Sequence, residues 1–139
     1  MEKQASTNYL EQSITGSQTA AGLLREELHN LDHEESWVLL LNNAHRPLAK
    51  MMITVGSIAS TIIDHRRIVK EALMKNATAV ILFHNHPSGD PTPSSADIKE
   101  TEKLRNACAF FDISLLDHII IADRCFFSFA DESKNTYRK

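Results

Sequence analysis

The sequence is poor in cysteine, with only Cys108 and Cys125 among 139 residues. Two cysteines cannot build the disulfide framework of a small secreted domain, which excludes that class of protein. Free cysteine is most often a buried apolar residue, so we expect two reduced, buried thiols. Their wide separation in the chain also makes them poor candidates for a shared zinc site.

The sequence also lacks a long hydrophobic run and an excess of either charge. No apolar stretch approaches the roughly 20 residues that span a bilayer, and the polar start of the chain lacks the apolar centre of a signal peptide. We therefore expect a cytoplasmic protein with no membrane partner. The 15 basic and 18 acidic residues give a net charge of −3, which argues against a strongly basic nucleic-acid-binding face but leaves room for a local patch.

The remaining sequence alternates between helical and strand patterns. Apolar residues at helical spacing predict helices over 17–30, 65–76 and 95–110, and short apolar runs predict strands over 36–41, 47–55, 58–63, 79–84, 113–122 and 125–130. A tight turn at 42–43 predicts a hairpin between the first two strands. This mixture predicts an α/β (or α+β) fold, a three-layer sandwich around a mixed sheet.

The chain length fits one domain. We expect a flexible segment over 1–16, a single folded domain over 17–131 and a flexible tail over 132–139. The strand expected over 58–63 would lie at an edge of the sheet, where it could pair with an extended peptide or with a second copy in a homodimer.

Two histidines follow the apolar run at 79–83. Positions i and i+2 of a strand face the same way, so His84 and His86 can direct both imidazoles to one point. Asp97 can join them from the start of the next helix. Two imidazoles and one carboxylate form a zinc site that leaves a fourth position for water, which is typical of catalytic rather than structural zinc. Zinc lowers the pKa of a bound water to about 7, so such a site supplies hydroxide at neutral pH.

A water-activating zinc site usually needs a carboxylate that is not a ligand, to take the proton from water and pass it to the leaving group. Glu34 and Glu35, just before the strand that contains Trp37, are the candidates, and each could instead be a solvated acid at the end of a strand. Ser94 could donate to a developing oxyanion, or it could cap the helix that carries Asp97.

A stiff loop over 87–93 holds three prolines and Gly89, and it separates the histidines from that helix. Further along the chain, Asp117 and His118 come at the start of an apolar strand. They could support the metal ligands from behind, or they could be an ordinary polar pair at a strand entry.

The spacing of these residues resembles a known motif. His84-x-His86-x7-Ser94-x-x-Asp97 with an upstream glutamate resembles the JAMM (JAB/MPN) zinc metalloprotease motif. The stretch HNHPSGDPTPSSADIKETEKL, followed by LLDHIIIA, resembles the RadC branch of that family. The upstream stretch EESWVLLLNNAHRPL is also similar and places Glu35 at the catalytic glutamate. The resemblance covers about residues 31–130.

The resemblance implies a cytidine-deaminase-like JAB/MPN fold and a Zn²⁺ ion held by His84, His86 and Asp97. It implies Glu35 as general acid/base, Ser94 at the oxyanion, and hydrolysis of a peptide or isopeptide amide, in some relatives beside a ubiquitin-like C-terminus. Two alternatives remain open. One is a DNA-repair-associated nucleic-acid-binding module or metal-dependent nuclease of the RadC family, and the other is a scaffold that keeps its metal without catalysis.

Overall fold

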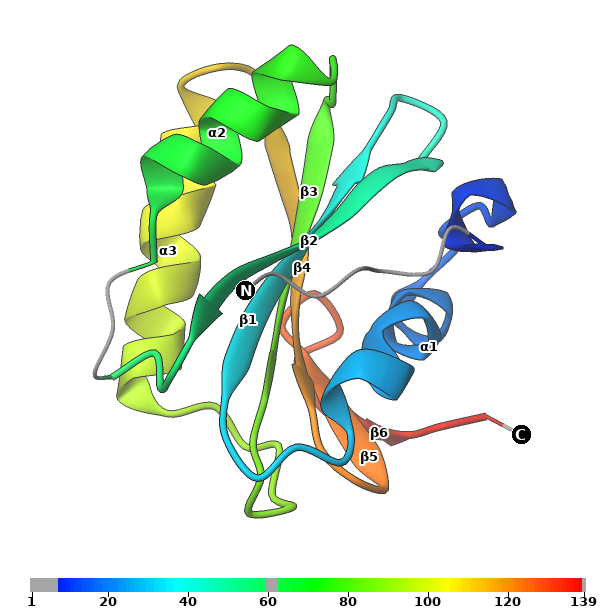
Figure 1. The fold of residues 1–139 in the computed structure, drawn as a ribbon, viewed down its shortest axis with the longest axis vertical. Coiled ribbons are helices and arrows are strands. Elements are labelled where there is room, and N and C mark those ends of the chain that lie inside the picture. The colour runs from blue at the N-terminus through cyan, green and yellow to red at the C-terminus, as the bar shows by residue number, and fades with distance from the viewer. Residues whose placement is uncertain (1–7, 60–62, 139) are drawn as a thin grey trace.

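A computed structural model describes residues 8–59 and 63–138 of the chain and shows a sheet between two layers of helix (Figure 1). The sheet consists of β1 (Glu35–Leu41), β2 (Pro47–Val55), β3 (Ala79–Asn85), β4 (Ser114–Ile121), β5 (Cys125–Ser128) and β6 (Ser133–Thr136). One face is covered by α1 (Ser17–Leu28), and the other by α2 (His65–Met74) and α3 (Ser95–Ala109). A short 3-10 helix, η1 (Asn8–Glu11), precedes α1.

The strands lie in the order β2-β1-β3-β4-β5-β6. Only β3 and β4 run parallel, joined by α3 in a crossover, while the other neighbours are antiparallel. The expected hairpin between β1 and β2 is present, and so is the expected mixed α/β sandwich. This architecture is consistent with a JAB/MPN fold.

The two central strands, β1 and β3, are buried along their whole length. Their side chains alternate between the two faces, as the pleat of a strand requires. Trp37, Leu39 and Leu41 of β1 join a core beneath α1, together with Ala79, Ile81 and Phe83 of β3. Val38 and Leu40, with Val80 and Leu82 of β3, join a second core beneath α2 and α3. This alternation determines which polar residues at the ends of the strands lie on the same face of the sheet.

The end of the chain differs from the expectation. We predicted a flexible tail over 132–139, but Ser133–Thr136 forms the edge strand β6 against β5. Tyr137 follows it, donates a hydrogen bond to the carbonyl of Ala122 at 3.2 Å and lies under the Arg25 guanidinium at 3.9 Å. The segment was predicted to be flexible because its sequence is polar. It forms a strand with one exposed face, and the contacts of Tyr137 hold its end in place.

Two other expectations need comment. Of the edge strand predicted over 58–63, residues 58 and 59 lie in a turn and 60–62 fall outside the described residues. The side chains of Ile58 and Ile63 are nevertheless buried in the core beneath α2 and α3. Among the described residues, no helix combines the length and apolar character needed to cross a bilayer.

The two cysteines are free, but they are not equally buried. Cys108 lies in the core beneath α2 and α3, where burial raises the pKa of its thiol to about 11. Cys125, at the start of β5, is only half-buried.

We expect Cys108 to resist thiol reagents in the folded protein, because the reactive species is the thiolate and burial suppresses both ionisation and access. At about pH 8, Ellman's reagent should modify Cys125 first and reach Cys108 only after unfolding in urea. Equal rates for both thiols in the folded protein would contradict the burial described for Cys108. Cys125→Ser identifies which thiol reacts.

Candidate metal centre

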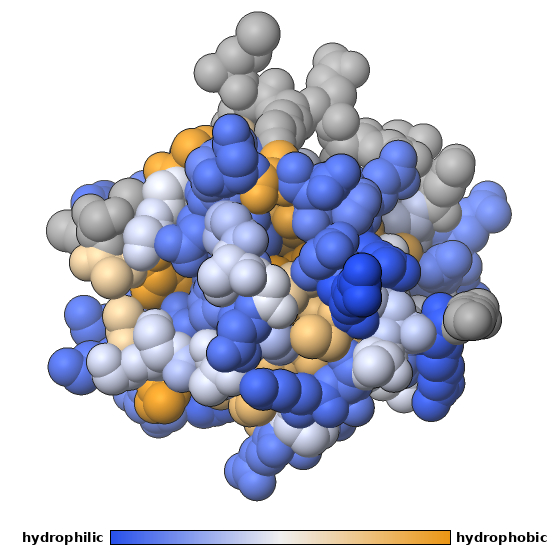
Figure 2. All heavy atoms as spheres, turned by 90° about the horizontal axis from the view of Figure 1, so that it is seen from below, coloured by the Kyte–Doolittle hydropathy of each residue, from blue (hydrophilic) through white to orange (hydrophobic). Residues whose placement is uncertain are grey.

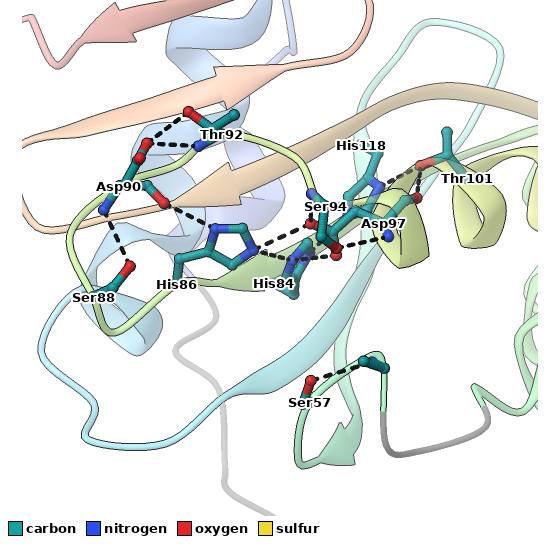
Figure 3. Close-up of polar contacts among 11 residues, drawn as sticks. Ser57, His84, His86, Ser88, Asp90, Thr92, Ser94, Asp97, Thr101 and His118 are labelled. Carbon is teal, nitrogen blue, oxygen red and sulfur yellow. Dashed lines mark hydrogen bonds and ion pairs between the residues drawn. The ribbon is translucent and has the colours of Figure 1, made fainter.

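Three side chains converge at the end of β3, as Figure 3 shows. The Nε2 atoms of His84 and His86 lie 3.0 Å apart. The Asp97 carboxylate reaches both, with Oδ1 3.0 Å from His84 Nε2 and Oδ2 3.2 Å from His86 Nε2. The structure thus brings together the three residues that the sequence predicted as metal ligands.

The two histidines occupy different environments. His84 is fully buried within β3, on the same face as Val80 and Leu82. His86 follows the last residue of β3 and is half-buried, and its backbone N–H donates to the carbonyl of Ile121. One ligand is therefore fixed by the core, and the other sits where the strand passes into the loop.

Asp97 is placed by the start of α3. Ser94 is the N-cap residue, and its hydroxyl accepts the Asp97 N–H at 3.1 Å. The Asp97 Oδ2 in turn accepts the Ser94 N–H at 2.7 Å, which completes a capping box. The same carboxylate therefore caps the first turn of α3 and faces the two imidazoles.

The outer nitrogen of each imidazole is also engaged. The Nδ1 of His86 lies 2.9 Å from the carbonyl oxygen of Asp90, and since a carbonyl can only accept, this nitrogen carries the proton. The Nδ1 of His84 lies 2.7 Å from Nε2 of His118, on β4. Such contacts behind metal-binding histidines fix the ring orientation and the tautomer.

Burial and charge set the protonation of the centre. Burial lowers the pKa of His84, which favours the neutral imidazole. Burial alone would raise the pKa of Asp97, but the adjacent His84 and His86 imidazoles outweigh burial and lower it, so the carboxylate is ionised. For His86, the opposing effect of burial is outweighed by the bonds to Asp97 and to the Asp90 carbonyl, and the pKa is raised.

This arrangement fits a metal ion. Neutral His84 directs a nitrogen lone pair at an ionised carboxylate and at a second imidazole nitrogen, all about 3 Å apart, and a cation among them, either a proton or a metal ion, would stabilise these groups. In a tetrahedral site with bonds of about 2.0–2.1 Å, neighbouring ligand atoms are about 3.3 Å apart. The observed spacings of 3.0–3.2 Å need only a small expansion.

A glutamate also reaches this point, but it is Glu34 rather than Glu35. Glu34, His84 and His86 each offer a ligand atom, and these atoms lie within 4.8 Å of one another. Because Ser36 pairs with His84 across β1 and β3, Glu34 falls on the same face of the sheet and beside His86.

The structure corrects the expected position of Glu35. Its carboxylate is buried on the opposite face, where Oε1 accepts from Trp37 Nε1 at 3.1 Å and Oε2 lies 2.7 Å from His33 Nε2. A side chain one residue away on a strand points to the other side of the sheet, so Glu35 cannot face the histidines while β1 keeps its register. Trp37 and Glu35 share the α1 face.

The backbone around Glu34 is held from two sides. Asn85, the last residue of β3, accepts the Glu35 N–H with Oδ1 and donates from Nδ2 to the His33 carbonyl, both at 2.8 Å. The N–H of Gly56, after β2, donates to the Glu34 carbonyl at 2.7 Å. No local pattern marks Asn85, because its contacts depend on the pairing of two strands that are distant in the chain.

The structure also bears on two alternatives that the sequence left open. Ser94 caps α3, while the oxyanion role expected for it stays a prediction. His118 does lie behind His84, while Asp117 faces away and accepts from the Ser128 hydroxyl and the Ala130 N–H. Thr101, which contacts His118, had no distinguishing pattern in the sequence.

The centre lies at the lower edge of the sheet in Figure 1, and Figure 2 views the molecule from that side. That face is mostly hydrophilic, with separate small hydrophobic patches. The loop residues Pro87–Asp90 are exposed there, next to half-buried His86. A polar ligand could therefore reach His86 from solvent, while His84 lies buried behind it.

Comparison with known proteins identifies the family of this domain. A family model described as RadC-like JAB domain matches residues 14–134, which is most of the chain. The chain belongs to the RadC-like JAB domain family. The two histidines, Asp97 and Glu34 all lie inside the matched region of this domain.

Several relatives share the domain. A UPF0758 protein of Flavobacterium johnsoniae is 43% identical over 119 residues, which cover 86% of this chain and 52% of the relative. A UPF0758 protein of Shouchella clausii is 40% identical over 125 residues, covering 90% and 54%. The UPF0758 protein YfjY of Escherichia coli is 43% identical over 119 residues, covering 86% and 74%. The chain spans about half the length of the first two relatives.

We expect Ser94→Ala to lower the free energy of unfolding by about 1 kcal/mol, because it removes the acceptor for an N–H at the start of α3. Urea denaturation of the metal-free protein measures this. Ser95→Ala, at the neighbouring exposed position, is the matched control and should have a much smaller effect. If both variants unfold at the wild-type midpoint, the capping box contributes no stability.

Proposed function

We propose that this RadC-like JAB domain is a zinc-dependent metallopeptidase or isopeptidase that hydrolyses an amide bond. The observation that carries the proposal is the convergence of His84 Nε2, His86 Nε2 and the Asp97 carboxylate beside Glu34. Two imidazoles and one carboxylate are a ligand set of catalytic zinc sites, with a fourth position open to water or substrate. When bound there, zinc would supply hydroxide at neutral pH by lowering the pKa of a coordinated water to about 7.

Glu34 is our candidate for the general acid/base. It is half-buried and lies within 4.8 Å of the histidine ligand atoms without being one of the three converging groups. A carboxylate at that position accepts a proton from the attacking water on Oε and returns it to the nitrogen of the leaving amine. The hydrogen bonds from Asn85 and Gly56 keep the Glu34 backbone in place during this transfer.

Ser94 is our candidate for stabilising the oxyanion. Its Oγ accepts the Asp97 N–H, which leaves the hydroxyl proton available for another acceptor. Ser94 is exposed and lies at the end of the loop, eight residues after His86, and its capping contact fixes the direction of the side chain. A donor held in advance toward a developing negative charge lowers the barrier to acyl transfer.

A peptide or an isopeptide is the substrate class we propose, including an amide beside the C-terminus of a ubiquitin-like protein. The hydrophilic face in Figure 2 suits a polar backbone better than an apolar small molecule. The longer relatives contain further sequence outside this domain, so the substrate of a complete protein of this family can depend on that additional sequence.

We expect Glu34→Gln to lower amide hydrolysis by about 10²- to 10⁴-fold, because the amide cannot accept a proton from water. Zinc content, measured by elemental analysis, should stay at the wild-type level, since Glu34 is not one of the three ligands in this proposal. Glu35→Gln is the matched control. It should keep most of the activity, because Glu35 contacts Trp37 and His33 on the other face of the sheet.

The substrate panel for this test combines fluorogenic peptides with ubiquitin-like isopeptide conjugates and single- and double-stranded DNA. Full amide hydrolysis by Glu34→Gln would exclude Glu34 as the acid/base. Zinc-dependent cleavage of DNA with no cleavage of any amide would replace the peptidase proposal with the nuclease alternative.

A further inference from the structure

A chain of buried hydrogen bonds runs from the candidate metal ligand His84 to helix α3 (Figure 3). His84 Nδ1 lies 2.7 Å from His118 Nε2, and His118 Nδ1 lies 2.6 Å from the Thr101 hydroxyl. The Thr101 hydroxyl lies 2.7 Å from the backbone carbonyl oxygen of Asp97, four residues earlier in the same helix. This series of hydrogen bonds begins at one candidate ligand, His84, and ends at the backbone of another, Asp97.

The proton positions along this chain follow from its last member. A carbonyl oxygen can only accept, so the single hydroxyl proton of Thr101 is directed to Asp97. The Thr101 oxygen must then accept from His118, which places a proton on His118 Nδ1. A neutral His118 protonated on Nδ1 has a lone pair on Nε2, and this nitrogen accepts from His84 Nδ1–H. His84 is left with its lone pair on Nε2, the atom that faces His86 and Asp97.

The surroundings hold this chain in one arrangement. His84 and His118 are completely buried, and Thr101 is nearly so, which leaves no water to take over the hydrogen bonds. The ring of Phe129 stacks on His118, with centroids 4.7 Å apart and planes within 3° of each other. A rotation of the His118 ring would therefore break a stacking contact as well as two hydrogen bonds.

We propose that Thr101 and His118 are positioning residues that hold the metal-binding nitrogen of His84 unprotonated and directed at the metal site. The inference rests on the proposed metal centre and deepens it. We call the hydrogen-bonded series His84–His118–Thr101 the relay. Without it, His84 can adopt the tautomer with the proton on Nε2. That proton has to leave Nε2 before the nitrogen can bind a cation. The relay also connects the two protein elements that supply His84 and Asp97, because Thr101 bonds to the Asp97 backbone directly.

The first test compares zinc affinity in Thr101→Val and Thr101→Ser, measured on the full chain by competition with a chromophoric chelator. Valine keeps the shape of threonine but has no oxygen, so we expect zinc binding to weaken by about 10-fold or more, as for other residues behind metal ligands. Serine keeps the hydroxyl and should bind zinc close to the wild-type level. Equal affinity in Thr101→Val and wild type would overturn the proposal.

A second variant keeps the test valid if Thr101→Val fails to fold. His118→Phe retains a ring to stack on Phe129 and removes both nitrogens, and we expect it to weaken zinc binding to a similar or larger extent. Wild-type affinity in this variant, with the fold preserved by circular dichroism, would also overturn the relay.

A third measurement needs neither a variant nor a metal. Long-range ¹⁵N–¹H correlation spectra of the metal-free protein with ¹⁵N-labelled histidine report the tautomer of each ring. We expect His84 and His118 to be protonated on Nδ1 only. A proton on His84 Nε2 would refute the relay even if zinc binds. If the protein shows the expected tautomers but binds no zinc, the relay is supported and the proposed function is refuted.

Discussion

The antiparallel pairing of β1 with β3 is the constraint on which the candidate centre depends. Both strands are buried on both faces, so a slip of one residue would turn Trp37 and Phe83 out of the core beneath α1 and disrupt both cores at once. With the register fixed, Ser36 stands opposite His84, and the preceding even-numbered residue, Glu34, reaches the histidines. Hydrophobic packing thus determines which glutamate faces the candidate metal site.

The polar groups of the centre are buried where an unpaired group would be costly, and the fold supplies a partner for each of them. His84 contacts His118, His118 contacts Thr101, and the Asp97 carboxylate accepts from the Ser94 backbone. Each partner comes from a different place along the chain. The loop, α3 and β4 therefore have to be assembled before the ligands are correctly oriented, which links the stability of the domain to its capacity for metal binding.

Much of this domain could be predicted from the sequence. The helices, β1 to β5 and the three candidate metal ligands follow from local patterns, because apolar periodicity and the His84-x-His86 spacing report on neighbouring residues. The position of Glu34 beside the histidines could not be predicted in the same way. Residues 37–41 are apolar on both faces, so the sequence of β1 carries no alternation that reveals its parity.

The other omissions have similar causes. β6 has a polar sequence and depends on β5 for its hydrogen bonds, while Thr101 and Asn85 act only through residues far away in the chain. Such contacts are set by tertiary structure, and no local pattern marks them. From the family resemblance we expected Glu35 at the centre, but Glu35 lies on the opposite face of the sheet and Glu34 lies beside the histidines, because adjacent residues of a strand point to opposite faces.

The decisive measurement is anomalous diffraction at the zinc absorption edge from crystals grown with zinc. We expect a single strong peak about 2.0–2.2 Å from His84 Nε2, His86 Nε2 and an Asp97 oxygen, with Glu34 beside it and Glu35 on the far side of the sheet. A zinc ion held by other residues, or a zinc-containing crystal with no peak at these histidines, would contradict it.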